Sequence, residues 1–124
     1  MIDIDSMPAG PEMDAAVGVV VMRRSTGVIN GVCRMARFDG AAEVGSRSFW
    51  EDSEPWQPST NIAHAWEVVE KLIERGYQVI VSSQSEREWG CDVVRWDRRA
   101  LASQENELTA PLAICRAALK ARKP

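Results

Sequence analysis

The stretch from Pro55 to Gly76 constrains the fold of this chain more than any other part of its sequence. It opens with a tryptophan between two prolines, in "PWQPST", and then shows apolar residues at intervals of three and four, which predicts an amphipathic helix. We expect Ser59 or Thr60 to cap this helix and Gly76 to end it. The apolar side, with Trp66 in the core, comprises Ile62, Ala65, Trp66, Val69, Leu72 and Ile73. Such a helix must bury that side against another layer of structure.

Two strands are predicted directly after this helix. "YQVIVSS" from Tyr77 is rich in β-branched residues, and "WGCDVVRW" from Trp89 to Trp96 alternates between two faces. Only the polar "QSERE" separates them, which favours an antiparallel hairpin. Trp89 and Trp96 fall on opposite faces of their strand, so helices on both sides of the sheet would bury both. We interpret the following "DRRALASQENEL" as a polar connection.

Helices are also expected near both ends of the chain. "PEMDAAVGVVVMRR" from Pro11 has helical spacing together with a β-branched run, and the early proline and acidic residues favour a helix over a strand. "TAPLAICRAALKA" has Thr109 as its cap and Pro111 in its first turn. Residues 1–10 end in Pro-Ala-Gly and indicate a flexible N-terminal arm.

The segment between these elements is predicted to be irregular. Four glycines punctuate it, and we expect an insertion at about 25–56 with at most a short strand from Val32 to Phe38. The order of elements predicts the α+β class: a three-layer sandwich of helix, antiparallel sheet and helix, formed by a single domain over residues 11–124.

Two segments resemble a known family. "PWQPSTNIAHAWEVVEKL" and "TAPLAICRAALKA" are similar in texture to the phage alpha-beta-alpha (ABA) sandwich domain, a family of small phage and prophage proteins. The resemblance covers residues 11–24 and 55–122, and it implies a helix at 11–24, a fold and a phage origin, but no activity. The chain departs from the family in Asn61, where an aspartate is usual, and in the long stretch between residues 25 and 50.

Composition limits the classes of function. The chain has 124 residues, of which 45% are hydrophobic and 27% charged, as in one soluble globular domain. Its net charge of -3 disfavours nucleic-acid binding. No basic start, long apolar segment or paired cysteine spacing is present, so we expect no membrane association and a location in the cytoplasm of a bacterial host.

The residue types that usually carry chemistry are sparse. His64 is the only histidine, and we expect it to be solvated on the polar side of its helix. Cys33, Cys91 and Cys115 are too far apart to suggest a zinc site, and we interpret them as core residues. No glycine-rich phosphate loop or calcium-loop spacing occurs. We therefore predict no metal, no cofactor and no catalytic residue.

The candidate binding residues lie in the loop before the predicted helix. Trp50 and Trp56, with Glu51, Asp52 and Glu54 between them, are candidates for contact with a partner. Trp56 has a second interpretation, which we favour: it packs back against the helix that it precedes. For Trp50 both interpretations stay open.

These residues lead to two functional hypotheses. The first is a small, non-enzymatic phage or prophage accessory protein that binds a host or phage protein, in one testable form to inhibit a bacterial defence system. The alternative is a small-ligand or nucleotide-binding domain, in which the acidic residues and tryptophans of the loop form the site. The sequence does not fix the oligomeric state.

Overall fold

The computed structural model describes residues 4, 6–24, 26–35, 55–95 and 100–122. Within these residues, the chain forms three helices and two antiparallel sheets, which confirms the predicted α+β class. The elements are α1 (Pro11–Val20), β1 (Thr26–Ile29), β2 (Val32–Met35), α3 (Ile62–Glu74), β3 (Tyr77–Ser85), β4 (Glu88–Arg95), β5 (Ala100–Glu107) and α4 (Ala110–Arg122).

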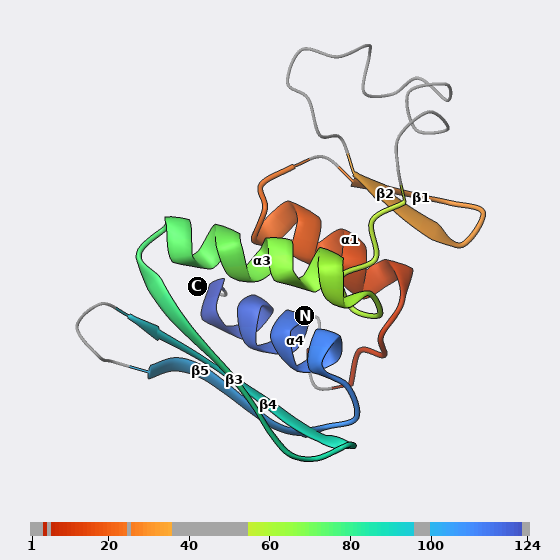
Figure 1. Ribbon diagram of the computed structural model, residues 1–124. Helices are drawn as coiled ribbons and strands as arrows, with labels where there is room; N and C mark the ends of the chain where they lie inside the picture. The colour runs from red at the N-terminus through yellow and green to blue at the C-terminus, as the bar shows by residue number, and fades with distance from the viewer. Residues whose placement is uncertain (1–3, 5, 25, 36–54, 96–99, 123–124) are drawn as a thin grey trace.

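The α4 helix occupies the centre of the domain. It packs against β4 and β5 on one side and against α3 and α1 on the others, and the β1–β2 hairpin lies beyond α1 (Figure 1). Ile114, Cys115 and Ala118 of α4 are fully buried. The many small residues of "APLAICRAALKA" allow neighbours to approach this helix closely from several sides.

The α3 helix begins one residue later than a cap at Thr60 would place it and two residues later than a cap at Ser59 would. Asn61 is the N-cap, and its side-chain oxygen accepts hydrogen bonds from the backbone N–H groups of Ala63 (2.9 Å) and His64 (3.3 Å). An asparagine and an aspartate both supply this acceptor. The departure from the family pattern at this position therefore preserves the cap.

The buried side of α3 is rotated from the predicted one. Ala65, Val68, Val69 and Leu72 face the core, whereas three residues predicted there are about half exposed: Ile62 (53%), Trp66 (49%) and Ile73 (54%). The apolar arc of this helix is wider than the surface that α4 and β3 cover. The core position predicted for Trp66 is therefore wrong.

The three-stranded sheet has the order β3-β4-β5. The predicted hairpin is confirmed, with Val79 opposite Val93 and Val81 opposite Cys91 on the face toward the helices. The segment interpreted as a polar connection is instead the strand β5, paired antiparallel with β4. Backbone pairing supplies the stability of such an edge strand, so its polar sequence does not reveal it.

The predicted irregular insertion contains a regular hairpin at its start. Strands β1 and β2 pair antiparallel with Ile29 opposite Val32, and the strand predicted from Val32 is confirmed as far as Met35. Asn30 and Gly31 have φ of 53° and 76°, as a two-residue type I′ turn requires. The dipeptide Asn-Gly is the sequence signal that predicts this hairpin.

The described part of the N-terminal segment, for which a flexible arm is the prediction, contacts the domain. Ile4 and Met7 pack against the core. The backbone carbonyl of Met7 accepts a hydrogen bond from Arg116 Nη2 (2.8 Å), and Arg116 also pairs with Glu107. The described part of this segment is thus held against α4.

Candidate functional site

Trp56 is a structural residue in this fold. Its side chain is 0% exposed, its backbone N–H donates to the Cys33 carbonyl (2.8 Å), and its Nε1–H donates to Glu67 Oε2 (2.9 Å). A side chain without exposed surface offers nothing to a partner, so Trp56 is removed from the candidate contacts. The other four candidates, Trp50, Glu51, Asp52 and Glu54, lie outside the described residues.

A buried polar network joins α1 to the turn before α3. Asp14 Oδ1 accepts from the backbone N–H of Ser59 (2.8 Å), and the Ser59 hydroxyl accepts from the Gly10 N–H (2.9 Å) and donates to the Gly10 carbonyl (3.4 Å). His64 is partly buried rather than solvated, and its Nδ1 accepts from the Gln57 N–H (2.9 Å).

This network does not activate the Ser59 hydroxyl as a nucleophile. A catalytic serine needs its hydroxyl to donate to a base that a third group orients. Here the Ser59 hydroxyl is bonded to backbone, and the two residues that resemble the other triad members, Asp14 and His64, each bond a different backbone N–H. The network fixes the position of the turn relative to α1.

Asp14 gives the fold a pH dependence that a variant can isolate. Burial raises the pKa of the Asp14 carboxyl above its ordinary value of 3.8, against the opposing effect of its hydrogen bonds to Ser59. Because the folded state then holds this proton more tightly than the unfolded state, stability is lost as the pH rises through the raised pKa. Asp14→Asn keeps an oxygen acceptor, but its amide does not titrate, so this variant lacks the loss of stability with rising pH. We expect its free energy of unfolding, relative to the unmodified protein, to rise with pH in urea titrations from pH ~4 upward.

The exposed Glu12 on the same helical turn offers a matched control. Glu12→Gln removes one carboxylate without touching the buried network, so it should not reproduce this rise. An equal pH dependence in both variants would show that general charge, rather than burial of Asp14, causes the effect.

The cysteines are core residues. Cys33, Cys91 and Cys115 are free and buried, and burial raises the pKa of Cys33 and of Cys91 to about 12. The thiolate is the nucleophilic form, and it is scarce at neutral pH when the pKa of the thiol is raised this far.

In the part of the chain that the structure describes, no three His, Cys, Asp or Glu side chains gather as metal ligands do. None of the described helices has the length and apolar character needed to span a membrane.

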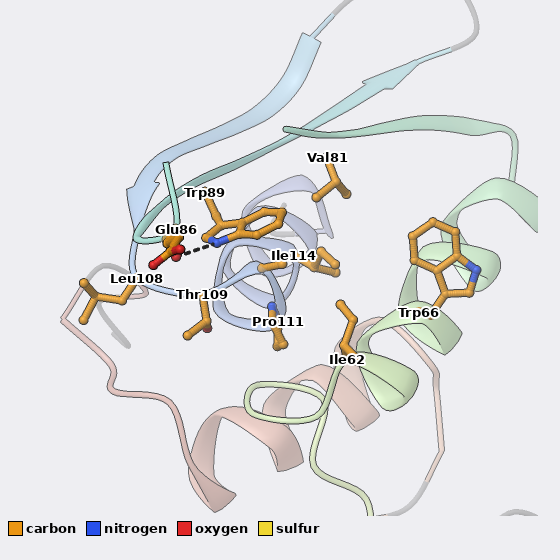
Figure 2. A pocket seen from close by; sticks show the side chains of 10 residues that line it. Ile62, Trp66, Val81, Glu86, Trp89, Leu108, Thr109, Pro111 and Ile114 are labelled. Atoms are coloured by element: carbon orange, nitrogen blue, oxygen red, sulfur yellow. Dashed lines mark hydrogen bonds between the residues drawn. The ribbon is translucent and has the colours of Figure 1, made fainter. Parts of the chain in front are cut away.

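A groove opens between α3, the β3–β4 hairpin and the start of α4 (Figure 2). Its volume is about 470 Å³, and its lining residues are Ile62, Trp66, Val81, Glu86, Trp89, Leu108, Thr109, Ala110, Pro111 and Ile114. Ile114 and Ala110 are buried and form the floor, whereas Ile62, Trp66 and Leu108, the last 65% exposed, form the rim. The groove thus presents apolar side chains to solvent.

The few polar groups of the groove are mostly bonded already. Trp89 Nε1–H donates to the Glu86 backbone carbonyl (3.1 Å), and the Thr109 hydroxyl accepts from the Leu112 N–H (3.3 Å), which confirms Thr109 as a cap of α4. Of the described residues that line the groove, Glu86 is the one that is charged. The groove therefore suits the binding of an apolar group, and its lining lacks a nucleophile with an adjacent base.

The sequence does not predict this groove. Its walls come from three elements that are separated along the chain, and its rim includes two residues, Ile62 and Trp66, that the helical pattern predicts to be buried. The signal present in the sequence is the width of the apolar arc on α3, which exceeds what α4 and β3 cover.

Comparison with known proteins adds one match. The family model described as the phage ABA sandwich domain matches residues 32–119, from β2 into α4. The match includes residues 32–54, which the resemblance noted above leaves out, and it does not include α1. No curated protein and no solved structure shows significant similarity to the chain.

Proposed function

The chain belongs to the phage ABA sandwich domain family, which indicates a phage protein, and from this premise we propose that it acts by binding a host or phage protein. The observation that carries the proposal is the exposed apolar rim of the groove. Ile62, Trp66 and Leu108 lie at its edge with about half or more of their surface exposed. Exposed apolar side chains around one groove mark a candidate site of interaction.

The residue types at the rim support a protein partner. Aromatic side chains, tryptophan above all, are enriched among the residues that dominate binding energy at interfaces. Trp66 is held on a regular helix, so little conformational entropy is lost when a partner covers it. The protonated, buried cysteines and the apolar character of the groove favour binding over catalysis.

One testable form of this function is inhibition of a bacterial defence system. The phage family supports the biological setting. Trp50, Glu51, Asp52 and Glu54 stay predicted contacts that would extend the interface beyond the groove. The direct readout is the plating efficiency of a restricted phage on bacteria that express this protein.

The test of the proposal is affinity capture from lysates of host cells and of phage-infected cells. We expect the unmodified protein to retain a specific partner and Trp66→Ala to lose it, because truncation of an aromatic anchor costs about 2 kcal/mol or more. Ile73→Ala is the matched control, since Ile73 lies on the same helix with similar exposure but does not line the groove. Both variants should keep the circular dichroism spectrum of the unmodified protein.

Two results would count against the proposal. Equal retention of the partner by Trp66→Ala and Ile73→Ala would place the contact elsewhere on the molecule. A rise of the melting temperature with nucleotides or divalent metal ions, without any protein partner, would instead favour the small-ligand alternative.

A further inference from the structure

The chemistry of the groove indicates what kind of partner segment it accepts. Building on the proposed function, we propose that the groove binds a peptide segment that presents one large apolar side chain beside a lysine or an arginine. The apolar side chain would enter between α3 and the β3–β4 hairpin, and the basic group would pair with Glu86.

The shape of the groove carries the first half of this proposal. The floor is made by buried residues of α4, and Ile62 and Trp66 stand on one side while Val81 and Trp89 stand on the other (Figure 2). A volume of about 470 Å³ accommodates a large side chain with part of its backbone. Because the rim is open and half exposed, a small molecule would keep more contact with water than ligands do in enclosed pockets, which bury about 70–90% of them.

The charge around the groove carries the second half. Among the described residues, Glu86 is the only charged one that lines the groove, and the neighbouring Arg87 in the same turn does not line it. A partner with a lysine or arginine next to its anchor gains a pairing with this carboxylate, whereas an acidic partner meets repulsion there. The indole of Trp89, which lies beside Glu86, adds a further attraction for a cation (Figure 2).

The same charges disfavour a second copy of the chain as the occupant. Each copy carries a net charge of -3, and a symmetric contact through this groove would bring two Glu86 carboxylates toward one interface. A partner of opposite charge meets no such repulsion.

The experiment is selection of binders from a displayed library of short random peptides against the immobilised full chain. We expect enriched peptides to carry Leu, Phe, Met or Trp next to Lys or Arg. Their affinity should fall about tenfold or more with Trp66→Ala and stay unchanged with Ile73→Ala. In a parallel selection against Glu86→Lys, the preferred charge beside the anchor should invert to Asp or Glu.

Several outcomes would overturn the proposal. Enriched peptides without a basic residue would show that the Glu86 carboxylate plays no part in recognition. The same charge preference in the selections against the unmodified protein and against Glu86→Lys would show this as well. Peptides whose affinity is unchanged by Trp66→Ala would bind elsewhere on the molecule. That result would leave protein binding as the function but would exclude this groove as the site. A dimer in sedimentation velocity that Trp66→Ala dissociates would identify a second copy as the occupant.

Discussion

Replacement of Trp56 by alanine is expected to lower the free energy of unfolding by about 3–5 kcal/mol, the range for buried aromatic residues. The indole is completely buried and lies where three elements meet: it approaches Gly18 of α1, its backbone bonds to Cys33 of β2, and its Nε1–H bonds to Glu67 of α3. The loss is a large share of the ~5–15 kcal/mol typical of a domain. Urea unfolding followed by far-ultraviolet circular dichroism measures it.

Two further variants make this result specific. Trp56→Phe keeps most of the aromatic contact and removes the donor to Glu67, so we expect a smaller loss, of about 1.5–3 kcal/mol for a hydrogen bond to a charged group plus some lost packing. Trp66→Ala removes an indole that is half exposed and should change stability far less than Trp56→Ala. Equal losses at positions 56 and 66 would contradict the assignment of one tryptophan to the core and the other to the groove.

The elements that sequence reasoning predicted correctly are those with a local signal. The α3 helix has strong period 3.6 patterning, α4 has Thr109 as its cap, and the β3–β4 hairpin has two β-branched runs around a short polar turn. Each of these signals lies within one short, continuous stretch of the sequence. Such elements can be predicted without knowledge of the elements that they pack against.

Two strands were missed for different reasons. The β5 strand has a polar sequence, "ALASQENE", and its contacts with β4 and α4 override that weak local preference. The β1 strand is only four residues long, and its local signal is the Asn30-Gly31 turn that pairs it with β2.

The candidate site shows the same limit at the level of single residues. The sequence favours packing of Trp56 against the fold and predicts a core position for Trp66. Trp56 is indeed buried, where it meets α1 and β2, whereas Trp66 lies beyond the edge of the surface that covers α3. Helical periodicity defines an arc of apolar residues, and only the neighbouring elements decide which part of it is buried.

The second large effect is expected at Gly18, where a glycine in a helix is required by close packing. A Cβ at this position would lie 2.3 Å from Thr26 Cγ2 and 3.2 Å from Trp56 Cζ3. The Thr26 side chain cannot rotate away freely, because its hydroxyl donates to the Ala15 carbonyl (3.2 Å). Gly18→Ala should therefore destabilise the fold by about 1–3 kcal/mol, although alanine in a helix is otherwise favoured over glycine by up to about 1 kcal/mol.

The double variant Gly18→Ala with Thr26→Ser decides whether this clash is the cause. Serine keeps the hydroxyl that bonds Ala15 and lacks the methyl group that meets the new Cβ. We expect the second substitution to restore most of the stability lost through the first, measured as a coupling energy from the four urea unfolding curves of the cycle. If the two losses simply add, contact with Thr26 is not what excludes a side chain at position 18, and the α1–β1 packing must tolerate more movement than its distances suggest. A strong coupling would instead establish that the contact of Gly18 with Thr26 sets how closely β1 can approach α1.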